Sequence, residues 1–353
     1  MNQTERLLLN VRAAKQSREE THAMAFEAKL FGRTRFGKYQ HCLELIEANS
    51  HFAPLWERLC LALFAGAGPS LAKLFGVDTS ENWARANRVI LDVLSVTESS
   101  AEEIARHLRR YVRLRKVCHD HLPLDEARAV VYDQPFYPVV THVTYALQPS
   151  ATARLNFVRE VVRGVSARRA LVADLGCGSG VILSEVLLMK REWTGHGLDI
   201  SPQSIAYARR LAAHKGVAAR ASFRTGCVTQ LPYADESLNL VIASEVVEHM
   251  PEPEAVINEI TRVLKPGGQL ILTMPIESRT PAHAHTLSGR EDLRALLTAA
   301  GLRVRRLEPR WHLGFGDDRK HVFALAEATR PGDYVTPDAV HNFSHAFPEP
   351  ERA

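Results

Sequence analysis

Residues 172–180 read Val172-Ala173-Asp174-Leu175-Gly176-Cys177-Gly178-Ser179-Gly180, an apolar run that stops in a glycine-rich turn. The pattern predicts a buried strand, the turn itself, and a helix over 180–190. Glycines at positions i, i+2 and i+4 keep side chains away from the face of the turn and allow positive φ without steric cost. The helix that follows points unpaired N–H groups at the same place. We therefore expect this turn to hold the polar part of a flat, nucleoside-like ligand.

A second predicted strand, over 194–199, ends in Asp199. A carboxylate at the tip of this strand is well placed to accept hydrogen bonds from both hydroxyls of a ribose. The alternative is that Asp199 only caps the helix that starts at Ser201 and Pro202, where proline suits the first turn. The glycine-rich turn upstream favours the ribose-binding interpretation.

Beyond residue 150 the pattern alternates strands with helices. We expect strands at about 170–175, 194–199, 221–225, 238–243, 269–274, 302–307 and 321–326, and helices at 153–165, 180–190, 202–214, 253–264 and 290–300. The alternation predicts a parallel sheet with right-handed crossovers, and the last two strands read as an antiparallel pair. The predicted fold class is therefore α/β, with a doubly wound, mostly parallel seven-stranded sheet and an antiparallel terminal strand.

Three regions follow from this pattern. Residues 1–150 are predicted to form a mainly helical domain that caps the substrate or forms a dimer, 151–328 the sheet domain, and 329–353 a tail. Within the first region, the helix 104–118 is basic; it contacts phosphates or, as we favour, presents a solvated face. The segment 121–150 reads as irregular and rich in aromatic residues and proline. It lines a pocket for a small, partly apolar molecule or is a linker packed on the core, and both interpretations stay open.

Four motifs occur in a fixed order. They are Asp174–Gly180 with Asp199, Leu231–Val241, Glu245–Pro251 and Arg262–Gly268. In this order they resemble the class I S-adenosylmethionine-dependent methyltransferases, in the ubiquinone-pathway branch, over about residues 151–327. The residues that the resemblance implies as contacts of S-adenosylmethionine are Asp174, Gly176, Gly178, Gly180, Asp199, Ile200, Cys227, Val228 and Ser244. One departure is Cys227, where the family often has an Asp that bonds the adenine amino group.

The spacing Glu245-x-x-Glu248-His249 predicts a second group of functional residues. At i, i+3 and i+4 these side chains would share one face of a helical turn. Two carboxylates and an imidazole make half of a divalent-metal site, and a loop histidine, His285 or His283, would complete it. The set resembles the magnesium ligands of small-RNA 2′-hydroxyl methyltransferases and, more loosely, of ubiquinone-pathway O-methyltransferases. Three interpretations stay open: a magnesium site, a catalytic base at His249, His285 or Glu245, and purely structural roles.

Composition limits the partners. The chain has 44 Lys and Arg against 40 Asp and Glu, a net charge of +4, so a nucleic-acid partner is not expected. Five cysteines without C-x-x-C spacing argue against a disulfide framework or a zinc site and for a reducing compartment. The N-terminus has no apolar signal core, and the longest apolar run, 59–68, is too short to span a bilayer. We expect a soluble, cytoplasmic protein.

The predicted function is methyl transfer from S-adenosylmethionine to an oxygen or nitrogen of a small-molecule acceptor, for example in secondary metabolism. The N-terminal helical region and the segment 121–150 would shape the acceptor pocket, and a homodimer is compatible with such a region. One alternative is an RNA or protein methyltransferase that docks its substrate on the helix 104–118. Another is a non-catalytic module that binds a nucleoside for regulation.

Overall fold

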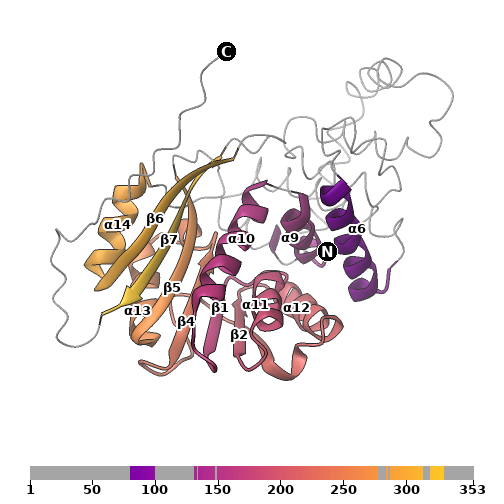
Figure 1. Ribbon diagram of the computed structural model, residues 1–353, viewed down its shortest axis with the longest axis horizontal. Coiled ribbons are helices and arrows are strands. Elements are labelled where there is room, and N and C mark those ends of the chain that lie inside the picture. Colours follow the sequence, from indigo (N-terminus) through magenta and orange to yellow (C-terminus); the bar gives the residue numbers. More distant parts are fainter. Residues whose placement is uncertain are drawn as a thin grey trace, which may run out of the picture.

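The central feature of the fold is a seven-stranded sheet, in the order β3-β2-β1-β4-β5-β7-β6 (Figure 1). A computed structural model of the chain describes residues 80–99, 131–132, 134–147, 149–276, 284, 287–312 and 319–329. Strands β1 to β5 pair in parallel, whereas β7 is antiparallel to both β5 and β6. This arrangement confirms the predicted α/β fold with its antiparallel end.

The strands follow the predicted positions closely at the centre of the sheet and extend further at its β6 end. They are β1 Leu171–Leu175, β2 Thr194–Asp199, β3 Ala221–Thr225, β4 Leu238–Ser244, β5 Leu264–Ile276, β6 Leu302–His312 and β7 Arg319–Ala328. The last four residues of β1 are buried, which explains its continuous apolar run, because a central parallel strand is covered on both faces. Strand β5 begins earlier than predicted because Leu264 already pairs with Leu238 of β4.

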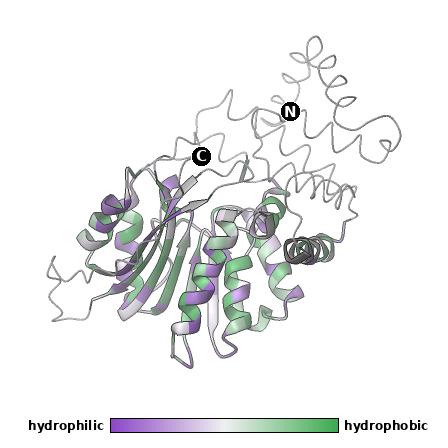
Figure 2. Ribbon diagram, turned by 45° about the horizontal axis from the view of Figure 1, so that its top comes forward, coloured by the Kyte–Doolittle hydropathy of each residue, from purple (hydrophilic) through white to green (hydrophobic). Residues whose placement is uncertain are grey.

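Helices cover both faces of the sheet. They are α6 Ser80–Thr97, α9 Tyr137–Leu147, α10 Pro149–Gly164, α11 Val181–Met189, α12 Pro202–His214, α13 Pro253–Val263 and α14 Arg290–Ala299, with 3₁₀ turns η2 Ala218–Arg220 and η3 Val247–His249. Helices α10, α11 and α12 share one buried apolar cluster, and α13 and α14 share the other. The central strands of the sheet are hydrophobic over much of their length, while most helices mix hydrophobic and hydrophilic residues (Figure 2). None of the helices in the described ranges is long and apolar enough to cross a membrane.

The region before β1 differs from the sequence-based expectation. Residues 137–147, expected to be irregular, form the helix α9, and α10 begins at Pro149 instead of residue 153. Buried His142 of α9 forms a hydrogen bond with Tyr207 of α12 (Nδ1 to Oη 2.8 Å). The same helix contributes buried valines to the apolar cluster that α12 shares, so a packed helix forms where the aromatic composition suggested a loop. The basic helix 104–118 lies outside the described residues, and the domain boundary at 150 stays a prediction.

Helix α6 packs beside α9 and α12. Its Asp92 accepts from Lys215 Nζ at 2.5 Å and lies 2.9 Å from His214 Nε2, both at the end of α12. Val93 and Val96 of α6 belong to the same apolar cluster as α10 and α11. The described part of residues 1–150 therefore packs on the same core as the sheet.

Strand β6 is one of the two edge strands of the sheet as far as the described residues show, and β3 is the other. The arginines of β6 pair with nearby carboxylates: Arg305 Nη2 lies 2.7 Å from Glu327, Arg306 Nη1 lies 2.9 Å from Glu160, and Arg310 Nη2 lies 2.7 Å from Glu308. The same strand contains Pro309. The Arg310 guanidinium also lies 5.1 Å from the centroid of the Phe323 ring. This edge therefore combines ion pairs with a cation–π contact.

Candidate functional site

The sheet reverses its winding between β1 and β4, which are neighbours in space although two strands separate them in sequence. Ligands of open α/β sheets bind beyond the carboxyl ends of the strands at such a switch point. Leu175 at the end of β1 pairs with Ala243 of β4 on one side and with Leu198 of β2 on the other. The residues that follow these three strand ends therefore meet at one edge of the sheet.

The glycine-rich turn follows β1, and its three glycines all have positive φ, 64° at Gly176, 51° at Gly178 and 77° at Gly180. A Cβ on Gly176 would lie 1.9 Å from Cγ2 of Val246, and one on Gly180 would lie 2.8 Å from Cβ of Ala208. Gly176 and Gly180 are therefore required by the protein's own packing as well as by the backbone conformation.

Gly178 has a different environment. A Cβ there would meet no described atom nearer than Oγ1 of Thr141, at 3.6 Å. Packing against the described residues thus does not demand this glycine, and those residues leave room beside it for a bound molecule. Thr141 belongs to α9, which places that helix next to the turn.

Asp199 bridges the turn and the start of α12. Its Oδ2 accepts from the Gly178 N–H at 2.8 Å, and its Oδ1 accepts from the Ser201 N–H at 2.9 Å. The N-cap of α12 is Ser201, whose hydroxyl accepts from Ser204 N–H. Burial raises the pKa of Asp199, and the two backbone donors oppose that rise. The carboxylate thus lies against the middle glycine of the turn, as a ribose contact requires; the ribose role itself stays a prediction.

Asp174 is the most buried acid on this side of the site. Burial raises the pKa of Asp174 to about 8, a backbone hydrogen bond from Leu183 opposes the rise, and the charge of Asp199 adds to it. Its Oδ2 has no hydrogen-bond partner among the described residues. A buried carboxyl oxygen without a donor is costly, and a cationic group of a ligand would satisfy it.

The predicted base-contacting residues flank this edge. Ile200 is 65% exposed although it follows a buried strand, which suits an apolar contact with a flat ring. Val228 is buried, and Cys227 is exposed, with its Sγ 3.0 Å from Oγ1 of Thr229. The open space at Gly178, the orphaned oxygen of Asp174 and exposed Ile200 together fit a cationic nucleoside-like ligand.

The second predicted group is arranged differently from the expectation. Glu245 has φ of 59° and lies before the 3₁₀ turn η3 instead of in a helix. Because Glu245 has a left-handed backbone and lies outside the turn, the three residues do not share the predicted helical turn. The Oε2 of Glu245 lies 3.1 Å from Nε2 of His321 and 3.5 Å from Nη1 of Arg154.

Glu248 and His249 form a separate pair within η3. Glu248 is only 1% exposed, and its Oε1 lies 3.9 Å from Nε2 of His249. The His249 ring meets the ring of Tyr132 edge-on, with centroids 6.2 Å apart. Tyr132 in turn accepts a hydrogen bond from Ser201 Oγ at its backbone oxygen (2.6 Å), so the segment before α9 runs between the β2 and β4 ends.

The described members of the predicted metal set do not fit a metal ion by themselves. No three His, Cys, Asp or Glu side chains in the described ranges are placed to hold one. The candidates His283 and His285 lie outside the described residues. Ala284, between them in sequence, donates its N–H to the backbone oxygen of Glu248 at 2.9 Å. The metal site therefore stays a prediction.

Sequence reasoning missed Arg154 and His321, which contact Glu245. Both are buried, at 7% and 0% exposure, and they come from α10 and β7. The available signal was weak: each is a charged or polar residue in an otherwise apolar pattern. Ser244, which was predicted, bonds Thr273 of β5 (Oγ to Oγ1 2.9 Å), beside this cluster.

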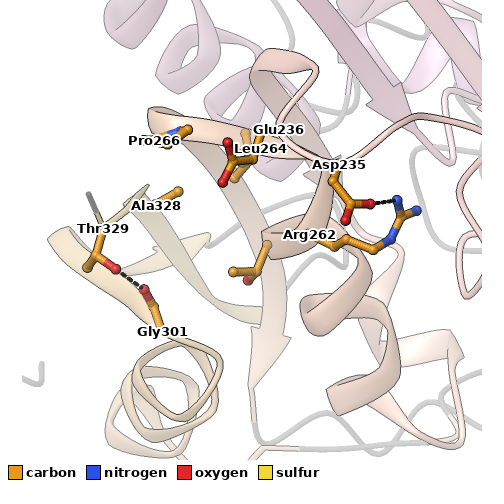
Figure 3. A pocket seen from close by; sticks show the side chains of 9 residues that line it. Asp235, Glu236, Arg262, Leu264, Pro266, Gly301, Ala328 and Thr329 are labelled. Atoms are coloured by element: carbon orange, nitrogen blue, oxygen red, sulfur yellow. Dashed lines mark hydrogen bonds and ion pairs between the residues drawn. The ribbon is translucent and has the colours of Figure 1, made fainter. Parts of the chain in front are cut away.

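A hollow of about 320 Å³ lies elsewhere, at the opposite edge of the sheet where β4, β5 and β6 begin. Its lining includes Asp235, Arg262 and Thr329, with Asp235 accepting from Arg262 Nη1 at 2.7 Å (Figure 3). Arg262 also bonds Glu259 and the backbone oxygen of Tyr233. The donors of Arg262 thus join α13 to the loop before β4. The hollow lies where the strands begin, whereas the predicted site lies at their carboxyl ends, so the two are separate.

Part of the chain is similar in sequence to known proteins. Residues 168–300 match the family model described as a methyltransferase domain. An arsenite methyltransferase of Halobacterium salinarum is 34% identical over 39% of this chain and 39% of its own length. A ubiquinone biosynthesis O-methyltransferase of Xanthomonas axonopodis pv. citri is 32% identical over 39% of this chain and 53% of its own. The chain thus spans about two fifths to one half of the length of these curated relatives.

Among solved structures, the [4+2]-cyclase SpnF aligns with a TM-score of 0.46 and 22% identity, over 52% of this chain and 83% of that chain. The family match covers the glycine-rich turn, Asp199 and the 245–249 stretch, which are the same residues that the structure gathers at the switch point. Residues 168–300 therefore match a methyltransferase domain, and their motifs resemble the class I, S-adenosylmethionine-dependent methyltransferases.

Proposed function

We propose that the chain transfers a methyl group from S-adenosylmethionine to an oxygen or nitrogen of a small-molecule acceptor. The observation that carries the proposal is the donor side of the site: an open Gly178 next to the carboxylate of Asp199 and the unpartnered oxygen of Asp174. The name of the ubiquinone biosynthesis relative supports an oxygen acceptor.

S-adenosylmethionine supplies a methyl group that its positively charged sulfur activates for displacement. The protein's part is mainly to hold donor and acceptor in line and to keep water out. We assign Asp174, the glycine-rich turn and Asp199 to the amino-acid and ribose portions, and Ile200, Cys227 and Val228 to the base. Tyr132 and Thr141, from the segment and helix beside this edge, are proposed to enclose the acceptor.

A hydroxyl or ammonium acceptor must also lose a proton. His249 is the described residue best placed to take it: its side chain is 22% exposed, and buried Glu248 lies 3.9 Å from its Nε2. His285 and a magnesium ion bound with Glu248 remain the alternative proposal for the same step.

The direct test is isothermal titration calorimetry with S-adenosylmethionine. The wild type should bind, and an Asp174→Ala, Asp199→Ala double variant should lose most of the affinity, since it removes both donor-side carboxylates. Absence of heat with the wild type, or equal affinity in both proteins, would contradict the proposal. Transfer of labelled methyl from the donor into the small-molecule fraction of a cell extract then separates an enzyme from a regulatory nucleoside-binding module.

An RNA acceptor is the second candidate, based on the basic helix 104–118. Binding through several phosphates weakens steeply with added salt, whereas binding of a neutral small molecule does not. Salt dependence of acceptor capture therefore distinguishes the two. We also propose a cytoplasmic location, supported by five cysteines without paired spacing, and a homodimer through the N-terminal region; cell fractionation and analytical ultracentrifugation test these two points.

A further inference from the structure

Three side chains far apart in sequence meet beside the end of β4. Arg154 comes from the first turns of α10, Glu245 follows β4, and His321 comes from β7. The Glu245 Oε2 lies 3.1 Å from His321 Nε2 and 3.5 Å from Arg154 Nη1, while its Oε1 accepts from Thr273 Oγ1 at 3.3 Å. Arg154 and His321 are buried, so solvent screens these contacts little.

The backbone of Glu245 shows what these contacts maintain. A non-glycine residue with φ of 59° is in an unfavourable conformation and persists only when its surroundings hold it. The Glu245 N–H donates to Thr273 O at 2.9 Å, and the side chain is fixed by its buried partners. The corner at the end of β4 is thus held from both the backbone and the side chain.

The next residue links this corner to the donor side. Val246 is buried and lies so close to Gly176 that no side chain fits between them. Gly176 is the first glycine of the turn beside which the open Gly178 lies. A change in the direction of Glu245 would therefore move Val246 and, through it, the floor of the turn.

We propose that Arg154 and His321 are positioning residues that hold the Glu245 corner so that Val246 closes against Gly176, and that they thereby set the shape of the donor-binding turn. The inference rests on the proposed binding of S-adenosylmethionine. It assigns to Glu245 a structural charge balanced by Arg154, in place of the predicted role as a metal ligand.

The charge balance gives the proposal a specific signature. Removing Arg154 alone takes a cation away from a largely buried carboxylate, whereas changing both residues removes the two opposite charges together. Changes at Arg154 and Glu245 should therefore be strongly non-additive. A lysine at 154 keeps the charge and should retain most of the effect, whereas methionine keeps an unbranched stem without the charge and should not. The contrast between the two substitutions separates the charge of Arg154 from a purely steric role of its stem.

The experiment measures the affinity for S-adenosylhomocysteine, a stable probe, by calorimetry on the full chain. Arg154→Met should weaken binding about tenfold, within the usual range of coupling between sites. Arg154→Lys should stay within about threefold of the wild type, and Arg154→Met combined with Glu245→Gln should bind more tightly than Arg154→Met alone. His321→Leu should also weaken binding, because it removes a second buried contact of the Glu245 carboxylate.

The matched control is Arg159→Met. It lies on the same helix and pairs with Glu185 of α11 at 2.6 Å, but both side chains are partly exposed and neither contacts the corner. It should leave affinity unchanged. Melting temperatures identify variants that fail to fold; if Arg154→Met is one of them, Glu245→Gln and the double variant carry the comparison.

The experiment distinguishes a failure of the proposed function from a failure of this inference. No binding by the wild type would defeat the proposed function rather than this inference. Wild-type affinity in folded Arg154→Met, additive effects in the double variant, or an equal loss in Arg159→Met would overturn the inference. So would heat on titrating magnesium alone that disappears in Glu245→Gln, because Glu245 would then be a metal ligand.

Discussion

The two sides of the site are built by different means. The donor side consists of β1, β2 and the turns that follow them, and it depends on backbone conformation: positive φ at Gly178 and backbone N–H groups that bond Asp199. The β4 side depends on side chains from distant segments, Arg154, Glu245 and His321, joined through charge. The donor side is therefore shaped mainly by backbone at two neighbouring strand ends, against which Val246 packs from the β4 side, whereas the β4 side depends on side chains from distant segments.

The largest expected effect is on the stability of variants at Gly176 and Gly178. Comparing them tests whether each glycine is needed for packing within the protein or for binding the donor. Gly176→Ala adds a Cβ 1.9 Å from Val246 Cγ2 at a left-handed position, so we expect it to destabilise the fold by about 3 kcal/mol, from backbone strain and overpacking together. Gly178→Ala meets no described atom within 3.5 Å and should cost only about 1 kcal/mol of stability. Urea unfolding measures both.

Donor affinity completes this comparison. Gly178→Ala should lose S-adenosylmethionine binding despite its mild effect on stability, because the added methyl group enters the space that the ligand needs. Equal destabilisation by the two substitutions, or full affinity in Gly178→Ala, would show that the two glycines have the same role and would remove the distinction drawn between them.

A smaller effect is expected for Asp174→Asn. The substitution should raise the relative stability at high pH and lower the affinity for the donor. The folded-state pKa of Asp174 is about 8, above its ordinary value of 3.8, so the folded protein holds this proton more tightly than the unfolded chain. Stability from this group therefore falls as pH rises from about 4 to about 8. Asparagine has no proton to lose and should flatten that fall, while donor affinity drops by roughly 2 kcal/mol with the loss of a charged hydrogen bond.

The measurement compares thermal melting of wild type and Asp174→Asn at pH 5 and pH 8, with calorimetric affinity at pH 8. The variant should gain relative stability at the higher pH. A variant that is less stable than wild type at pH 8, or one that binds the donor normally, would show that Asp174 is a structural acid. Asp199→Asn serves as the companion, since it removes the neighbouring carboxylate and keeps Asp174.

The smallest expected effect on donor affinity is that of a substitution on the β4 side, at His249. His249→Ala should change donor affinity by no more than about 0.5 kcal/mol, as for a substitution away from the bound groups, because His249 contacts Tyr132 and Glu248 instead of the glycine-rich turn. Methyl transfer should fall far more than binding. If donor affinity fell as much as methyl transfer, His249 would belong to the donor side. The distinction between the two sides of the site would then be wrong.

The same contrast explains what the sequence could predict. The glycine-rich turn, the strand that ends at Asp199 and the succession of strands and helices after residue 150 follow from local periodicity and turn chemistry, and the structure has them where expected. The arrangement of Glu245 was wrong because helical spacing was assumed across a residue that adopts positive φ. Nothing in the neighbouring residues signals that conformation; the contacts that hold it come from Arg154 and His321.

The helix α9 was missed for a related reason. Its aromatic and β-branched residues read as a loop, yet burial against α12, through His142 and Tyr207 among others, stabilises the helix. Tertiary packing overrode local propensity here. Contacts between segments that are remote in sequence therefore account for both corrections.

Strand β6 has a consequence for how this protein behaves at high concentration. An unpaired outer strand is a template on which another chain can add a strand and begin to aggregate. On β6, Pro309 offers no N–H for such pairing, and an approaching copy of the same strand would bring Arg303, Arg305 and Arg306 near their own counterparts. The arginines that pair with carboxylates within one molecule thus also discourage fibre growth between molecules.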